Sequence, residues 1–153
     1  MPDVWNRVVD RWRRSNIPAN AEATDESIAA FESQFQVALP PDVHRYFGML
    51  NGTGQEMDED MYRFWPLCEV KPVQDELSDA NGFIYPDRFA YPDCYVFADY
   101  MISCWLYAVR LTNDSAQPAP VYRVTAGDVP GEQMAPSFCD FMSRYADDPN
   151  SVI

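Results

Sequence analysis

Clustered carboxylates are the residues of this sequence with the clearest capacity for chemistry. Two carboxylates that converge in an apolar pocket can act as a general acid and a general base. Most of the clusters, however, lie in segments predicted to be loops, where solvated carboxylates are poor general acids. An acidic surface that docks on a basic protein needs only the charge. We therefore predict no catalytic residue and a protein-binding role for eight acidic side chains: Asp58, Glu59, Asp60, Asp75, Glu76, Asp79, Asp87 and Asp93.

A single histidine and four scattered cysteines offer a second possible chemistry. His44 is the only histidine, and no C-x-x-C pair is present, whereas zinc sites need several Cys or His ligands at short spacing. His44 lies one residue off the apolar face of its predicted helix, so we expect it on the surface. The alternative is a catalytic dyad with Cys68, Cys104 or Cys139. We predict reduced, buried cysteines, no metal and no cofactor.

Two further motifs resemble ligand-binding loops but lack the geometry that such loops require. The segment 52–54 (GTG) follows a predicted helix, whereas a phosphate loop follows a strand and opens a helix. Asp58, Asp60 and Glu69 have the spacing of calcium ligands in an EF-hand, but Arg63 stands where the sharp turn needs glycine. We therefore expect neither a nucleotide nor calcium at these positions.

The chain carries a strong excess of negative charge. It has 24 acidic and 11 basic residues and a formal net charge of −13. Residues 1–15 carry +2, so the remaining 7 basic and 22 acidic residues give −15. A surface this acidic repels nucleic acids and anionic lipids, and it speeds the capture of a basic protein. We expect a basic protein partner, no nucleic acid and no membrane. The alternative is that the charge serves solubility or reflects an Asp-rich, Lys-poor bias of the proteome.

Helical periodicity marks the first third of the chain and its C-terminal part. Thr24 or Asp25 is the expected N-cap of the second helix, and Pro41 fits the first position of the third. Asn51-Gly52 supplies the left-handed backbone that ends a helix. In the first helix, apolar residues lie on one face and a stripe of arginines on the opposite face. We expect the apolar face to pack on the core. The four predicted helices span about 3–16, 25–39, 41–50 and 137–145.

Beyond residue 61, short aromatic and β-branched runs separated by turns predict strands. These runs cover 62–70, 95–101, 102–111 and 120–125. Helices, then strands, then a helix predict an α+β fold, with a mainly antiparallel sheet packed with N-terminal helices and a C-terminal helix. A length of 153 residues without a linker-like tract predicts a single domain over 1–153. No apolar signal segment opens the sequence, so we expect a cytoplasmic protein.

A series of short motifs follows in a fixed order along the N-terminal part of the chain: Ile28-x-x-Phe31-Glu32, Leu39-Pro40-x-Asp42, Tyr46-Phe47 and Asn51-Gly52. A Phe97-Ala98-Asp99 run and a closing helix come later. This order resembles that of the SUKH superfamily, to which the fungal cell-wall assembly regulator domain belongs. One stretch departs from it, because residues 100–105 (YMISCW) stand where members often carry a glycine-rich turn.

The resemblance implies a single α+β domain that binds proteins and is not an enzyme. Many bacterial members look like immunity proteins, which neutralise a polymorphic toxin, often a nuclease, and the fungal relatives are interaction scaffolds. A cytoplasmic immunity protein with an acidic docking face is therefore our first functional hypothesis. A non-enzymatic adaptor is the second. A small carboxylate-dependent hydrolase is the third, and it requires a deep pocket with two converging carboxylates.

Overall fold

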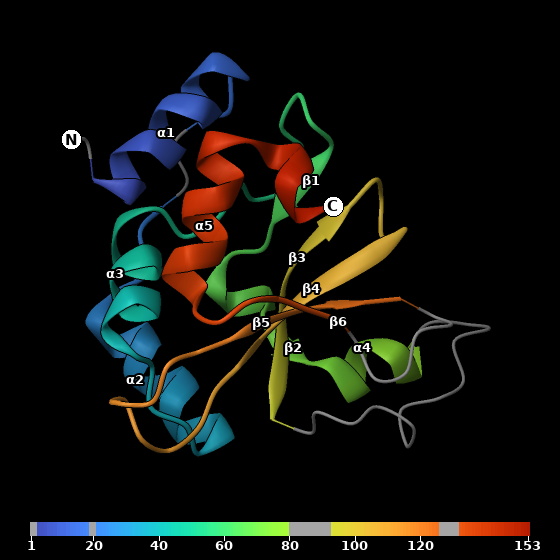
Figure 1. Cartoon of the computed structure of the whole chain (residues 1–153). Coiled ribbons are helices and arrows are strands. Elements are labelled where there is room, and N and C mark those ends of the chain that lie inside the picture. The colour runs from blue at the N-terminus through green and yellow to red at the C-terminus, as the bar shows by residue number, and fades with distance from the viewer. Residues whose placement is uncertain (1–2, 19–20, 80–92, 126–131) are drawn as a thin grey trace.

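Five α-helices and a six-stranded sheet make up the part of the chain that the computed structural model describes, residues 3–18, 21–79, 93–125 and 132–153 (Figure 1). The helices are α1 (Val4–Arg14), α2 (Asp25–Phe35), α3 (Pro41–Met49), α4 (Val73–Asp79) and α5 (Phe138–Asp147). The strands are β1 (Tyr62–Phe64), β2 (Lys71–Pro72), β3 (Cys94–Tyr100), β4 (Trp105–Arg110), β5 (Val121–Val124) and β6 (Glu132–Ala135). Two 3₁₀ turns, η1 (Leu67–Glu69) and η3 (Pro149–Val152), complete the described elements.

The sheet is antiparallel throughout the described strands, in the order β1-β3-β4-β5-β6, and β2 also pairs with β3. The helix α5 packs against the sheet, because Phe138 contacts Phe97 of β3 and Phe141 contacts Tyr107 of β4, each with ring centroids 5.1 Å apart. In Figure 1, α1, α2, α3 and α5 lie to one side, and α4 lies beside β2 at the other. The predicted α+β architecture with N-terminal helices and a C-terminal helix is confirmed.

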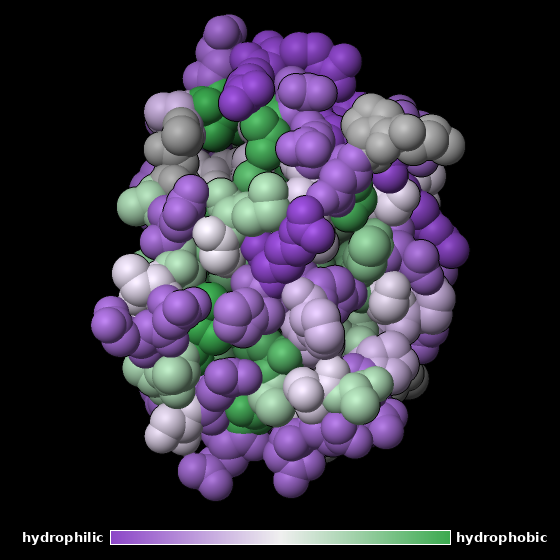
Figure 2. Space-filling model, turned by 90° about the vertical axis from the view of Figure 1, so that its left-hand side faces the viewer, coloured by the Kyte–Doolittle hydropathy of each residue, from purple (hydrophilic) through white to green (hydrophobic). Residues whose placement is uncertain are grey.

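The helix α1 packs on the core through its apolar face, as the sequence predicts. Trp5, Val8 and Trp12 are buried, and the indole N–H of Trp12 donates to the hydroxyl of Tyr145 in α5 at 3.0 Å. Figure 2 shows the molecule from the side of α1, α2 and α3: hydrophilic side chains dominate this face, and apolar atoms are gathered in narrow strips between them.

The arginine stripe of α1 binds acidic residues of the same chain. Arg7 forms an ion pair with Asp147 at the end of α5, and Arg11 pairs with Asp60 at 2.9 Å. Arg11 also donates to the carbonyl of Ala146. These contacts fix α1 against α5 and against the loop before β1. They also neutralise some of the acidic side chains of the same chain.

The predicted helix ends need one correction. Thr24 caps α2, and Pro41 is the first residue of α3, both as predicted. The helix α2, however, ends at Phe35 and does not reach residue 39. Gln36 adopts left-handed backbone with φ of 58°. Pro40 is extended, because Pro41 disfavours helical backbone at the position before it.

The predicted strands also need correction around β1 and β2. The run 62–70 is not one strand: β1 ends at Phe64, and Pro66, which has no N–H for a ladder, precedes η1. Residues 102–104 form a turn before β4 and are not part of a strand. The strand β6 lies where no strand is predicted. Residues 73–79 form helix α4 where the sequence predicts a loop.

Candidate binding groove

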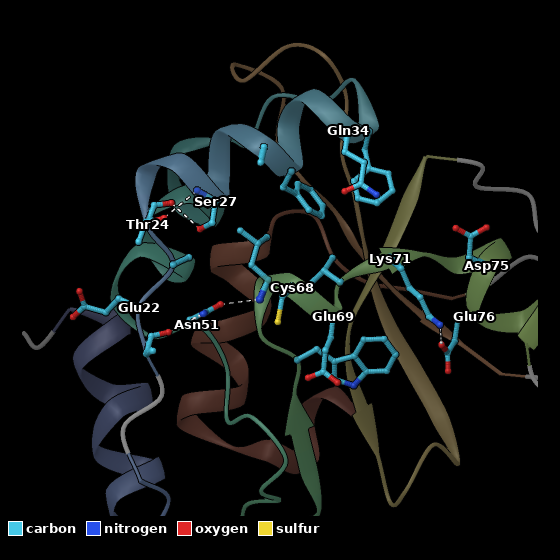
Figure 3. A pocket seen from close by; sticks show the side chains of 18 of the residues that line it. Glu22, Thr24, Ser27, Gln34, Asn51, Cys68, Glu69, Lys71, Asp75 and Glu76 are labelled. Atoms are coloured by element: carbon cyan, nitrogen blue, oxygen red, sulfur yellow. Dashed lines mark hydrogen bonds and ion pairs between the residues drawn. The ribbon is translucent and has the colours of Figure 1, made fainter.

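A groove of about 940 Å³ lies between α2 and the segment 63–76 (Figure 3). Its walls come from residues 21–35, from Asn51 and from that segment, and Ser103 of the β3–β4 turn also lines it. Ligand sites in proteins occupy about 300–1,000 Å³, so the groove is large enough for a ligand or for part of a partner protein. It brings together elements that lie far apart in the sequence.

The groove has an apolar floor and a charged rim. Phe31 and Phe35 of α2 contribute to the floor and contact Tyr95 of β3 with ring centroids 6.0 and 5.3 Å apart. Trp65, which is buried, lines the groove from the other side. Figure 3 shows charged side chains along the opening. The charged lining residues are Glu22, Arg63, Glu69, Lys71, Asp75 and Glu76.

Asn51 lies at one end of the groove, and Gly52 follows it where the backbone passes against β1. The side chain of Asn51 donates to the carbonyl of Ala21 at 2.8 Å and accepts the N–H of Leu67 at 2.7 Å, so it joins the two walls. Gly52 has φ of 76°, and an added Cβ would lie 2.5 Å from the carbonyl oxygen of Phe64. Glycine is required there, because the backbone is left-handed and passes directly against β1.

A buried carboxylate fixes the position of Trp65 and Arg63. Asp99, which is 4% exposed, accepts hydrogen bonds from the indole N–H of Trp65 at 2.7 Å and from Nε of Arg63 at 3.3 Å. It also accepts the backbone N–H of Ser103 at 3.2 Å. The guanidinium of Arg63 lies over the Trp65 ring and pairs with Glu69 at 3.4 Å. One aspartate thus positions two lining side chains and the adjacent turn.

The structure places two of the predicted docking residues on this groove. Asp75 is exposed, and Glu76 is half-buried and pairs with Lys71 at 2.8 Å; both belong to α4 and line the groove. Glu59 is exposed, and Asp60 is paired with Arg11. These two lie in the loop before β1, at the other end of the sheet from α4 (Figure 1). The predicted residues therefore do not form one continuous face.

Three of the remaining candidates are described only in part. Asp93 is exposed and lies directly before β3. Asp79 belongs to the backbone of α4, and its side chain lies outside the described part of the structure. Asp87 falls outside the described residues. Their docking roles stay predictions.

Asp58 is not the solvated surface carboxylate that the sequence predicts. It is 3% exposed, and its carboxylate accepts the backbone N–H groups of Asp60 and Tyr62, each at 2.9 Å. The hydroxyl of Tyr145 donates to its other oxygen. Burial raises the pKa of Asp58, and the hydrogen bond from Tyr145 opposes that rise. Asp58 organises the loop before β1 and is not available to a partner.

The residues with other chemical potential are dispersed. His44 is exposed, as predicted. All four cysteines are free; Cys94 is buried, but Cys68 and Cys104 are exposed, which corrects the expectation that the thiols are buried. Burial raises the pKa of the Cys94 thiol to about 12. Among the described residues, no three His, Cys, Asp or Glu side chains gather where they could hold a metal.

Sequence reasoning did not find the groove or two of its acidic residues. Glu22 precedes the cap of α2 in a polar stretch, and Glu69 lies in a run that was predicted to be a strand. Neither has a periodic signal that could place it beside α4. Of the helices in the described part of the chain, none combines the length and apolar character needed to span a bilayer.

The comparison with protein families decides the relationship. A model of the SMI1/KNR4 family (SUKH-1) matches residues 22–144. The chain belongs to the SUKH-1 family. A comparison with curated proteins finds no match.

In this SUKH-1 domain, the signature motifs hold the framework around the groove. The carboxylate of Glu32 accepts the N–H of Leu39 at 2.7 Å, which fixes the extended hinge after α2. Asp42 accepts the N–H of Cys139 at 2.9 Å and so joins the start of α3 to the start of α5. The side chain of Asn51 joins the walls of the groove, as described above. The SUKH-1 signature thus has structural roles in this chain.

Proposed function

We propose that this SUKH-1 domain is a cytoplasmic immunity protein that binds a toxin and neutralises it by covering a basic active face. The observation that carries the proposal is the net charge of −13, in a family whose bacterial members resemble immunity proteins. A nuclease toxin must present basic side chains to the phosphates of its substrate, and an acidic inhibitor is attracted to the same side chains. The domain acts by binding and performs no catalytic step.

The proposed contacts are acidic residues that solvent can reach. They are Glu59, Asp60, Asp75, Glu76 and Asp93, and buried Asp58 is excluded. Because Asp60 is paired with Arg11, its contribution to docking depends on exchanging that partner for a basic residue of the toxin. Asp75 and Glu76 combine charge with the groove, so we expect them to contribute most, although Glu76 must first exchange its partner Lys71.

Co-expression tests the proposal. The full chain is produced together with the protein encoded next to its gene, and growth and co-purification are measured. Rescue of growth from a toxic neighbour, with recovery of a one-to-one or higher complex, is the expected result. A toxic neighbour that is neither bound nor neutralised would overturn the proposal, and a non-toxic neighbour that co-purifies would point to an adaptor.

A further inference from the structure

We propose that the groove between α2 and the segment 63–76 binds an extended, arginine-bearing segment of a partner protein. This inference rests on the proposed function, because it names the part of the partner that the acidic domain would hold. It assigns the docking of the partner to this groove and names the class of segment that would occupy it.

The charges around the groove favour a cationic occupant. Among the described residues, its lining contains four carboxylates and two cations. Arg63 is already paired with Asp99 and Glu69, and Lys71 is paired with Glu76. The cations are therefore largely neutralised within the chain, and an incoming positive charge meets an excess of negative charge. The carboxylates are Glu22, Glu69, Asp75 and Glu76.

The carboxylates are spread along the groove and not gathered at one point. Figure 3 shows Glu22 at one end, Glu69 near the middle, and Asp75 with Glu76 at the other end. Glu22 and Asp75, the two outermost, are both exposed. A compact cation would contact one of these positions at a time. A segment that lies along the groove with several basic side chains would contact all of them, which favours an extended chain.

The floor of the groove selects arginine among basic side chains. Phe35, which is half-buried, and Phe31 supply aromatic surface in the groove, whereas the Trp65 ring already carries the guanidinium of Arg63. A guanidinium stacks on aromatic rings and pairs with a carboxylate through two parallel hydrogen bonds, whereas a lysine ammonium does neither as well. Arg63 shows the same chemistry within the chain, since its guanidinium lies 5.2 Å from the Trp65 ring centre and pairs with Glu69.

The wall formed by α2 leaves room for a backbone. Ser27, Ala30 and Gln34 follow one another at spacings of three and four residues, so they lie on one face of the helix, and all three line the groove. All are uncharged, and Ser27 and Ala30 are small. A peptide backbone can therefore approach this wall closely while its side chains reach the floor and the acidic rim.

A peptide probe tests the inference with the full chain. The probe is a fluorescein-labelled decapeptide of alternating arginine and leucine, and its binding is followed by fluorescence anisotropy. Ala30→Arg places a bulky cation in the groove and should weaken binding by about tenfold or more. Ala29→Arg is the matched control, because Ala29 is an exposed neighbour on α2 that does not line the groove; it should change binding by less than about twofold.

A second pair of variants separates the groove from the charge of the whole molecule. The double variant Glu22→Gln, Asp75→Asn removes two groove carboxylates, and Asp25→Asn, Glu26→Gln removes two exposed carboxylates of α2 outside the groove. Only the first should weaken binding substantially, and a decapeptide with glutamate in place of arginine should not bind. Circular dichroism melting curves establish that each variant is folded.

The outcomes distinguish this inference from the proposed function. Absence of probe binding, or equal loss with Ala29→Arg and Ala30→Arg, overturns the groove assignment. Self-association of the chain that Ala30→Arg abolishes also overturns it, because the occupant would then be a second copy. If a toxin that the wild-type chain neutralises is also neutralised by Ala30→Arg, the immunity function stands and the groove assignment fails. If the probe binds in the groove but no toxin is neutralised, the proposed function fails alone.

Discussion

Asp58 shows how far a residue's role can differ from that of its neighbours in sequence. Three consecutive acidic residues, 58–60, predict a solvated cluster. In the structure Glu59 alone is exposed, Asp60 pairs with Arg11, and Asp58 is buried beneath Tyr145. No local pattern distinguishes the three, because the burial of Asp58 depends on a tyrosine that lies 87 residues away in the chain. Such a contact is a property of the tertiary fold.

The buried state of Asp58 predicts a pH-dependent stability. Folding raises the pKa of this carboxyl, so the folded chain holds the proton more tightly than the unfolded chain. Its contribution is then largest below the unfolded pKa of about 4 and is lost as the pH rises through the folded pKa. We expect the free energy of unfolding of the wild type, relative to Asp58→Asn, to fall as the pH rises from about 4.

Tyr145→Phe serves as the companion variant for that experiment. It removes the hydrogen bond that lowers the pKa of Asp58, so the loss of stability should occur at a higher pH than in the wild type. Chemical denaturation at a series of pH values measures both effects. Parallel stability curves for the wild type and Asp58→Asn would contradict this account.

Gly48 and Gly52, four residues apart, should respond in opposite ways when each is replaced by alanine. Gly52 has left-handed backbone, and an added Cβ would lie 2.5 Å from a β1 carbonyl. Gly48 lies within α3, and an added Cβ would meet nothing within 4 Å. We expect Gly52→Ala to lower the free energy of unfolding by about 2 kcal/mol or more. Gly48→Ala should raise it by about 0.5–1 kcal/mol. Urea unfolding measures both, and equal effects would contradict the assignment.

At the level of the elements, the sequence predicts most of what local chemistry determines. Caps and prolines place the start of α2 and α3, and apolar spacing identifies α1 and α5. The helix α4 is missed because VQDELSD is short and has few apolar residues to show a period. The strand β6 is missed because Glu132 and Gln133 at its start are polar and exposed. The groove is missed because it depends on how α2 and α4 are placed.

The β3–β4 turn is an element whose backbone conflicts with its residues. Met101, Ile102 and Ser103 have φ of 49°, 54° and 63°, although none is glycine. A glycine-rich turn, which the family resemblance leads us to expect at this place, would fit such a backbone. In this chain the conformation is held by hydrogen bonds, including that from the N–H of Ser103 to Asp99 and that from the N–H of Met101 to Met61 at 2.9 Å.

Replacing Ile102 by glycine should therefore stabilise the domain. A β-branched residue in left-handed backbone costs about 1–2 kcal/mol, and Ile102 is 79% exposed, so little packing is lost with its side chain. After the extra flexibility of glycine in the unfolded chain is subtracted, Ile102→Gly should raise the free energy of unfolding by about 0.5–1 kcal/mol. Ile102→Ala removes the same side chain without relieving the backbone. Thermal unfolding measures both variants. Equal stability of Ile102→Ala and Ile102→Gly would contradict the proposed backbone strain.

At the scale of the whole molecule, part of the negative charge is neutralised by ion pairs within the chain. Arg7 and Arg11 of α1 neutralise acidic residues of α5 and of the loop before β1. Arg123 and Lys71 pair with glutamates of β6 and α4. What a partner meets is therefore the remaining charge, and its position matters as well as its total. This distinction between position and total separates a docking surface from an acidity that serves solubility alone.

Two triple reversals with the same net charge test that distinction. One reverses exposed proposed contacts, and the other reverses exposed acidic residues of α1, α2 and α5. Each reversal to lysine adds two charges, so three change −13 to −7 in both variants. Because both variants keep the same net charge and attract a basic toxin equally at long range, a difference between them reports local docking. The first variant is Glu59→Lys, Asp75→Lys, Asp93→Lys, and the control is Asp10→Lys, Glu26→Lys, Asp140→Lys.

The measurement is the association rate of each variant with the toxin that the wild-type chain neutralises, followed by stopped flow. The first variant should associate about tenfold more slowly than the wild type at low salt, with a weaker dependence on ionic strength, because it lacks the charges that steer the encounter. The control should lose much less of the rate. Equal slowing would mean that total charge alone governs association. No slowing in either variant would remove electrostatic attraction from the proposed mechanism, and the toxin would then be recognised through apolar contacts such as the floor of the groove.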